Sequence, residues 1–213
     1  MIRRGLDVEA VTIDAYGTLV TLDDPVPRLR AALRAHGVER SEAEVAQAFA
    51  AEVAHYVPRS HEGRDEATLA LLRRDCAKVF LAAAGADGVE PESFVADFMA
   101  SLRFRPLEGA ADACTRLAAA GLRLAVVSNW DVGLHDHLAA LGLDGVVDAV
   151  VTSADAGAPK PDPRIWRIAL ERLGARTAVH VGDSDADAEG ARVAGVRFEP
   201  APLAAAADRI LAA

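Results

Sequence analysis

Several side chains that could take part in hydrolysis stand directly after short apolar runs. Asp14 follows VTI, Ser128 and Asn129 follow the run RLAVV, and Asp183 follows AVHVG. A carboxylate can attack an electrophilic centre, and carboxylates are also ligands for hard cations. If each run is a strand of a parallel sheet, these side chains meet at one edge, because ligands bind there at the carboxyl ends of the strands.

Two further charged residues fit the same edge. Lys160 lies in the loop GAPKPDP, which follows the run DAVVT, and Asp187 comes one helical turn after Asp183. Taken singly, Lys160 could be a solvated loop charge, and Asp183 could cap the next helix. Because four runs each deliver a reactive or charged side chain to the same edge, one functional site is a better interpretation than four unrelated loop and capping residues. Three carboxylates around one lysine also favour a divalent cation with oxygen ligands, Mg2+ first.

The elements that must position these residues alternate between short apolar runs and longer helical patterns. This alternation predicts an α/β fold, a Rossmann-like parallel sheet flanked by helices. The expected strands are 8–13, 122–127, 148–152, 178–182 and 196–198. The expected helices of this core are 110–120, 132–141, 162–173, 185–194 and 203–211.

The stretch from about residue 25 to 103 differs, because its pattern is helical throughout. Ser41 followed by Glu44 predicts a capping box at one helix start. The expected helices are 25–36, 41–57, 64–84 and 91–102. We therefore expect a core domain built from residues 1–20 and 107–213, with an all-helical cap domain inserted at 21–106.

Composition excludes some classes of partner. The 213 residues carry a net charge of -9, which argues against nucleic-acid binding through phosphate contacts. No apolar run approaches a membrane span, and the N-terminal stretch does not resemble a signal sequence. Two cysteines far apart, Cys76 and Cys114, predict a reducing compartment rather than a disulfide framework. We expect the protein to act on a small anionic molecule. We also expect it to be cytoplasmic and to be a monomer or a homodimer.

Four motifs in this order, IDAYGTL, VVSN, the Lys160 loop and VGDSDAD, resemble the haloacid dehalogenase-like hydrolase superfamily. The resemblance covers essentially the whole chain and includes a helical cap inserted after the first motif. It implies that Asp14 attacks the substrate and forms a covalent aspartyl intermediate. Ser128, beside Asn129 in VVSN, would hold the transferred group, and Lys160 would neutralise its charge.

The resemblance also implies a metal site. Asp183 would bind Mg2+, and Asp187 would reach the ion directly or through a water. Asp14 would contribute a carboxylate oxygen. The backbone carbonyl of Tyr16 is a further candidate ligand, because a carbonyl does not depend on the side chain.

Tyr16 itself is a departure from the phosphatases of the superfamily, which carry an acid/base aspartate at this position. A phenol is a poor base at neutral pH, and losing such a group typically costs about 10²–10⁴ in rate. The first motif instead resembles metal-independent 2-haloacid dehalogenases, which lack the aspartate pair and carry a tyrosine where this chain has Trp166. The sequence therefore favours a Mg2+-dependent phosphomonoester hydrolase, slow or limited to good leaving groups. A dehalogenase and a weakly catalytic phospholigand-binding protein are the alternatives.

The substrate selectors are expected in the cap. The stretch 55–66 is its least helical part and offers Arg59, His61 and Arg64, although a polar interhelix loop is the more ordinary interpretation. Arg103 and Arg105 flank the return to the core and could meet an anionic substrate.

Overall fold

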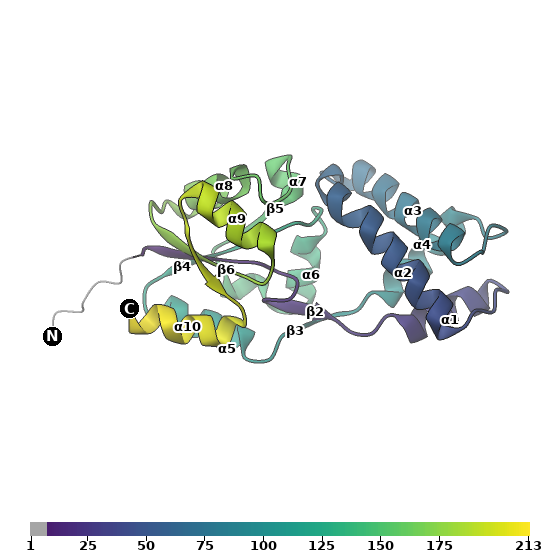
Figure 1. Cartoon of the computed structure of the whole chain (residues 1–213), viewed down its shortest axis with the longest axis horizontal. Helices are drawn as coiled ribbons and strands as arrows, with labels where there is room; N and C mark the ends of the chain where they lie inside the picture. Colours follow the sequence, from purple (N-terminus) through teal and green to yellow (C-terminus); the bar gives the residue numbers. More distant parts are fainter. Residues whose placement is uncertain (1–7) are drawn as a thin grey trace.

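A five-stranded, wholly parallel sheet forms the centre of the molecule in the computed structural model, which describes residues 8–213 (Figure 1). The strand order is β5-β4-β1-β6-β7. The strands are β1 (Ala10–Ile13), β4 (Arg123–Ser128), β5 (Ala149–Thr152), β6 (Ala178–Gly182) and β7 (Arg197–Pro200). The chain moves outward from β1 to β5, then returns to the other side of β1. The order thus reverses between β1 and β6, which is where open α/β sheets bind ligands.

Helices cover both faces of this sheet (Figure 1). The helices of one face are α5 (Ala110–Ala119), α6 (Leu134–Ala140) and α10 (Leu203–Ala212), and those of the other face are α7 (Ser153–Ala156), α8 (Arg164–Leu173) and α9 (Asp185–Ala194). A short 3-10 turn, η2 (Asp144–Val146), follows α6. All four residues of β1 are buried; Val11 and Ile13 enter one hydrophobic cluster and Ala10 enters the other. This double burial explains why the central strands are apolar runs.

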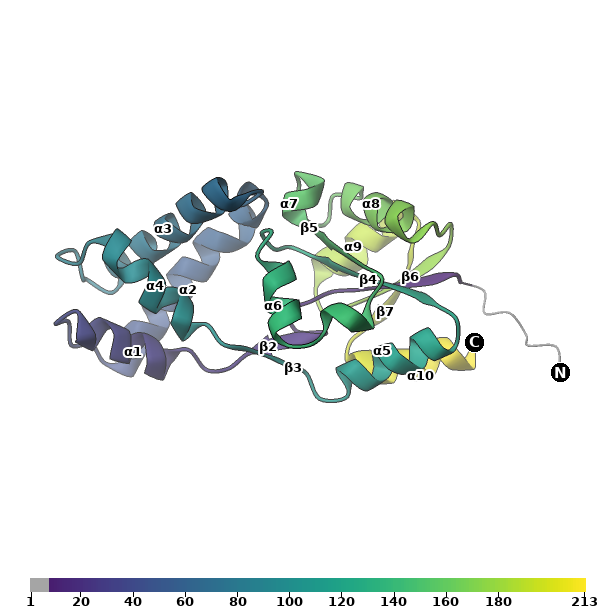
Figure 2. The ribbon, with the colours of Figure 1, turned by 180° about the vertical axis from the view of Figure 1, so that it is seen from behind.

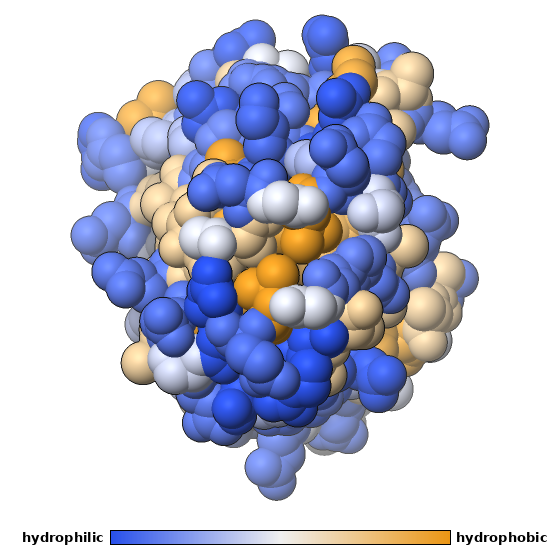
Figure 3. Space-filling view, turned by 90° about the vertical axis from the view of Figure 1, so that its right-hand side faces the viewer, coloured by the Kyte–Doolittle hydropathy of each residue, from blue (hydrophilic) through white to orange (hydrophobic). Residues whose placement is uncertain are grey.

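The remaining helices form a separate bundle beside the sheet edge (Figures 1 and 2). This helical insertion consists of α1 (Val26–Ala35), α2 (Glu42–Tyr56), η1 (Val57–Glu62), α3 (Glu66–Ala83) and α4 (Pro91–Ser101). It packs around its own hydrophobic core, in which Phe80, Phe94 and Phe98 are in mutual contact. Its far end is mostly hydrophilic on the surface, with a small hydrophobic area near the centre (Figure 3).

Two crossing segments join the insertion to the core. They pair as an antiparallel ribbon of β2 (Val20–Leu22) and β3 (Phe104–Pro106). Neither strand was expected from the sequence, because three residues with a polar Thr21 or Arg105 in the middle give no usable periodicity. The four-residue helix α7 was missed for the same reason of length.

The expected α/β fold class is otherwise confirmed, with element ends shifted by only a few residues. The capping box of Ser41 and Glu44 is present at the start of α2, as predicted. Within residues 8–213, no helix combines the length and the apolar character needed to cross a membrane.

Candidate active site

Asp14 is held by a tight turn at the carboxyl end of β1. Its backbone N–H donates to Val181 of β6 at 2.8 Å, so the residue continues the sheet pairing by one position. The turn then folds back, with the N–H groups of Leu19 and Val20 donating to the carbonyl of Ala15. The Asp14 side chain is buried, and its Oδ1 accepts a hydrogen bond from Ser128 Oγ at 3.0 Å.

Lys160 connects three elements through its buried ammonium group. Nζ donates to Asp14 Oδ1 at 2.5 Å, to the Val127 carbonyl at 3.2 Å, and also to Asp187 Oδ1. All three protons of the ammonium are therefore used. Burial alone would lower the pKa of Lys160, but the carboxylates of Asp14 and Asp187 raise it above the ordinary value. The lysine is a fixed positive charge of this site.

Asp187 also contacts a buried histidine of β6. His180 Nε2 lies 2.9 Å from Asp187 Oδ1, and His180 Nδ1 lies 2.9 Å from Thr12 Oγ1. Burial opposes ionisation of Asp187, yet the hydrogen bond from His180 and the charge of Lys160 hold its pKa well below the usual range. Because Asp187 is a carboxylate, it accepts from His180 Nε2–H, and Nδ1 then accepts from the Thr12 hydroxyl. Burial lowers the pKa of His180, which fits this neutral tautomer.

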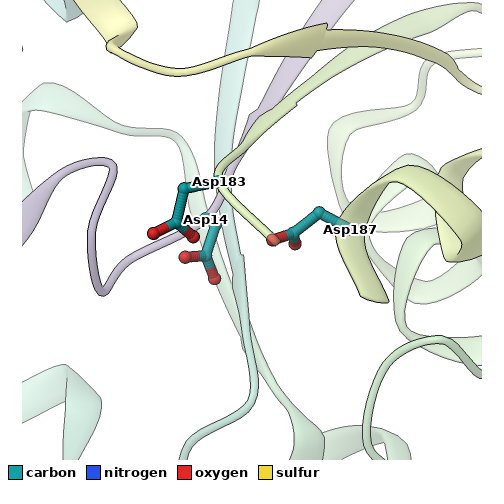
Figure 4. A group of neighbouring side chains, drawn as sticks. All are labelled: Asp14, Asp183 and Asp187. Atoms are coloured by element: carbon teal, nitrogen blue, oxygen red, sulfur yellow. The ribbon is translucent and has the colours of Figure 1, made fainter. Parts of the chain in front are cut away.

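Three carboxylates converge at the end of β1 and β6 (Figure 4). Oxygen atoms of Asp14, Asp183 and Asp187 all lie within 4.8 Å of one another. Burial raises the pKa of Asp14 despite Lys160, and burial together with Asp187 raises that of Asp183. The cluster is thus short of positive charge, and a donor set made only of oxygen suits a hard divalent cation such as Mg2+.

The other expected residues of the site have distinct positions. Both ends of the Asn129 side-chain amide bind the main chain of Lys160, at 2.6 Å and 3.3 Å, so Asn129 fixes the lysine loop. The Tyr16 side chain is half exposed and lines the cavity described below. Trp166, at the position where the dehalogenases carry a tyrosine, is fully buried beneath the sheet edge, with its ring edge-on to His180 at 5.1 Å.

A cavity of about 500 Å³ extends from these residues into the space between the core and the helical insertion. The residues Asp14, Ser128, Lys160, Asp183 and Asp187 lie together at its core end. Most of the remaining wall is apolar. Both parts of the molecule contribute to this wall, including Phe49, Leu72, Phe98 and Met99 of the insertion and Phe104 and Trp130 near the core.

The charged candidates of the stretch 55–66 do not line this cavity. Arg59, His61 and Arg64 lie outside it, as do Arg103 and Arg105. Arg105 instead pairs with Asp23, the residue directly after β2, at 2.8 Å.

The polar residues that do line the wall are ones that no sequence motif pointed to. They are Glu52, Tyr56, Arg73, Asp131 and His137. Glu52 is 5 % exposed, and burial raises its pKa to about 6 although the neighbouring Cys76 thiol opposes the shift. An acidic residue in the middle of an apolar helix face was the one available signal, since such residues are rarely buried without a reason.

Comparison with known proteins agrees with this geometry. The model of the haloacid dehalogenase-like hydrolases matches residues 8–195. The chain belongs to this hydrolase family. The hydrolase is 37% identical over 190 residues to the haloacid dehalogenase-like hydrolase domain-containing protein 3 of Mus musculus, covering 84% of this chain and 75% of that protein.

Relatives with more specific names also match this hydrolase. A phosphoglycolate phosphatase of Cereibacter sphaeroides is 35% identical over 91 residues, 42% of each chain. The L-2-haloacid dehalogenase of Xanthobacter autotrophicus, solved with chloropropionic acid covalently bound, superposes with a TM-score of 0.64. It is 27% identical and covers 90% of this chain and 76% of its own. The names of these two relatives describe hydrolysis at different kinds of centre, phosphorus in one and a halogenated carbon in the other.

Proposed function

We propose that this hydrolase is a Mg2+-dependent phosphomonoesterase that acts through an aspartyl-phosphate at Asp14. The observation that carries the proposal is the trio Asp14, Asp183 and Asp187, whose oxygens lie within 4.8 Å of one another. Lys160 already uses all its protons, so it donates no hydrogen bond to Asp183. Without a metal ion, three neighbouring carboxylates would have only one lysine to offset their charge, which is costly at a buried site.

Asp14, Asp183 and the Tyr16 carbonyl would hold the ion, with Asp187 behind them. The Oδ1 of Asp187 accepts from Lys160 and His180, and its Oδ2 accepts from Ser184. We therefore expect Asp187 to contact the ion through a water molecule. Mg2+ bound there would offset the negative charge of the phosphoryl oxygens.

The residues of the chain supply the rest of the mechanism. The free Oδ2 of Asp14 bonds to phosphorus while the ester P–O bond breaks, and the electron pair leaves with the alcohol oxygen. Ser128 and Lys160 orient the attacking carboxylate through its Oδ1. Water then bonds to phosphorus, the Asp14–phosphorus bond breaks, and phosphate leaves. The leaving oxygen takes its proton from water, since the family's acid/base position is Tyr16, and so acidic alcohols react fastest.

The decisive experiment is phosphate release from 4-nitrophenyl phosphate, with Mg2+ and with EDTA, in the natural protein and in Asp14→Asn. We expect release that needs both Mg2+ and Asp14. In Tyr16→Asp, hydrolysis of alkyl phosphates should rise, because a carboxyl group can then protonate the leaving oxygen. Release that persists in Asp14→Asn would overturn the proposal.

A second candidate function is metal-independent dehalogenation of 2-haloacids. The first motif and the similarity to the Xanthobacter enzyme favour it, since a halide leaves without a proton. Asp183 and Trp166 oppose it. Chloride release from 2-chloropropionate in EDTA would establish this candidate, and binding of a phosphorylated ligand without turnover would instead indicate a binding protein.

The location and assembly expected from the sequence belong to the same proposal. We expect a cytoplasmic protein that is a monomer or a homodimer. Cell fractionation would test the location, and light scattering would test the oligomeric state.

A further inference from the structure

The cavity beyond the phosphoryl end has a wall suited to an apolar group. Phe104 and Trp130 lie with ring centroids 5.0 Å apart, and His137 adds a third ring at 4.9 Å from Phe104. Burial lowers the pKa of His137, which keeps this ring uncharged at neutral pH. Phe49 and Leu72 contribute to the wall on the insertion side. Rings arranged in this way offer a large contact area to a flat apolar ligand.

The size of the cavity agrees with this wall. About 500 Å³ lies within the usual range of sites that enclose a whole drug-sized ligand. A phosphate group with two carbon atoms would occupy only the core end, and most of the apolar wall would then remain in contact with water.

The charges on the wall disfavour a second anionic group. Asp131 Oδ1 and an Arg73 terminal nitrogen both lie within 3 Å of the point that a Cβ on Gly133 would occupy, but the two side chains form no hydrogen bond to each other. Asp131 further accepts hydrogen bonds from the Tyr56 hydroxyl and the Gly133 N–H, both at 2.8 Å. On this part of the wall, two acidic side chains, Glu52 and Asp131, therefore stand against the single guanidinium of Arg73. No cation among residues 8–213 contributes to the environment of Glu52, whose pKa is raised by burial.

We propose that the substrate is a phosphate monoester of a bulky apolar alcohol, preferably aromatic, which carries no second anionic group. The phosphoryl group would sit at Asp14, and the alcohol would fill the space between the rings of the core and the helices of the insertion. This inference rests on the proposed phosphomonoesterase function and names its substrate class. It distinguishes this hydrolase from a phosphoglycolate phosphatase, whose substrate is small and carries a carboxylate.

Matched substrates test the two halves of the proposal. Phenyl and 2-naphthyl phosphate have leaving groups of nearly equal acidity but differ in apolar area, and we expect kcat/KM to be about tenfold higher for the naphthyl ester. Phenyl and 4-carboxyphenyl phosphate differ in charge, and we expect about tenfold lower kcat/KM for the carboxylate. Equal rates within both pairs, or a preference for phosphoglycolate, would overturn the inference.

Matched variants assign these preferences to the wall. Val53 lines the cavity and is 38% exposed, whereas Leu71 is 59% exposed and lies outside it. Val53→Asp should remove the naphthyl preference, and Leu71→Asp should keep it. Glu52→Gln should relax the discrimination against 4-carboxyphenyl phosphate, while Glu62→Gln, at an exposed residue outside the cavity, should not. Identical behaviour of the two members of each pair would place the selectivity elsewhere.

Binding separates the inference from the proposed function. In Asp14→Asn, calorimetry should find 2-naphthyl phosphate bound at least tenfold more tightly than phenyl phosphate, whether or not the natural protein turns either ester over. Absence of Asp14-dependent turnover together with this binding preference would overturn the phosphomonoesterase and keep the apolar ligand class. Asp14-dependent turnover without this binding preference would keep the phosphomonoesterase and overturn the apolar ligand class.

Discussion

Gly17 shows how closely the residues of the site are fitted. Its φ is +84°, a conformation that side chains other than glycine adopt at a cost, and a Cβ there would lie only 2.0 Å from Asp183 Oδ2. The turn that carries Tyr16 therefore passes directly against the carboxylate proposed to bind the metal. Gly37 has almost the same φ, +78°, but nothing lies within 4 Å of its Cβ position.

These two glycines make a matched pair for mutation. Gly37→Ala should destabilise the fold by about 1 kcal/mol, because it places alanine at a positive φ, and Gly17→Ala should cost more, because its Cβ also meets Asp183. Only Gly17→Ala should displace Asp183, and its Mg2+ affinity should fall roughly tenfold to a hundredfold. Calorimetric Mg2+ titration and urea unfolding measure the two effects. Equal Mg2+ affinity in both variants would show that Asp183 is not a ligand.

Glu52 should leave a signature in the pH dependence of stability. Folding raises its pKa from 4.5 to about 6, so the folded state holds the proton more tightly than the unfolded state. The free energy of unfolding should therefore fall as pH rises between about 4.5 and 6. Relative to the natural protein, Glu52→Gln should gain about 2 kcal/mol between pH 4.5 and 7. Urea unfolding at both pH values measures this gain, and an equal gain in Glu62→Gln would contradict the assignment.

The residues near the phosphoryl end could be predicted from the sequence, whereas those of the far wall could not. Asp14, Ser128, Lys160 and Asp183 all follow strands, and strand ends meet at one edge whatever the details of packing. Glu52 lies on a helix of the insertion, and which face of that helix meets the core depends on how the two parts dock. No local pattern of residues encodes that docking.

At the scale of elements, α9 carries both a capping function and a site function. Ser184 accepts from the Asp187 N–H at 3.2 Å, and Asp187 in return accepts from Ser184, which completes a capping box at the start of the helix. The same box occurs in α2 with Ser41 and Glu44, far from the cavity. The cap of α9 thus fixes the Asp187 side chain whose other oxygen meets Lys160.

Removal of the two caps should have equal effects on stability and unequal effects on activity. Ser184→Ala and Ser41→Ala should each cost about 1 kcal/mol in unfolding free energy. Ser184→Ala should also lower kcat, because Asp187 Oδ2 loses the hydroxyl contact and keeps only the Ser184 N–H at 3.2 Å. Thermal unfolding and phosphate release from 4-nitrophenyl phosphate measure the pair, and an equal loss of kcat in both variants would contradict a special role for the cap of α9.

The predictability of the elements follows their length and burial. The strands of the central sheet are apolar because both faces are covered, and this makes them visible as runs. The ribbon of β2 and β3 is short, and its partners are more than 80 residues apart in the chain. Its pairing is a consequence of where the insertion leaves and re-enters the core, which no short window of sequence contains.

At the scale of the whole molecule, a few polar contacts join the helical insertion to the core across the cavity. Tyr56 Oη donates to Asp131 Oδ2 at 2.8 Å, and Ser60 and Ser153 share a hydrogen bond of 3.0 Å between their hydroxyls. The Val132 N–H also donates to a carbonyl of the insertion, that of Gly63, at 3.0 Å. Interfaces held by so few contacts open easily, and opening would admit a bulky substrate.

Weakening these contacts should therefore change the exchange between closed and open forms. In the double variant Tyr56→Phe, Ser60→Ala, three hydrogen bonds between the insertion and the core are lost, two of the Tyr56 hydroxyl with Asp131 and one of Ser60 with Ser153, at a net cost of about 0.5–1.5 kcal/mol each. Amide hydrogen exchange at Val132 should then accelerate, and KM for 2-naphthyl phosphate should rise, since the apolar wall is complete only when closed. Ser93→Ala is the control, because Ser93 bonds only within the insertion, to Glu90. Unchanged exchange at Val132 in the double variant would mean that apolar packing alone holds the two parts together.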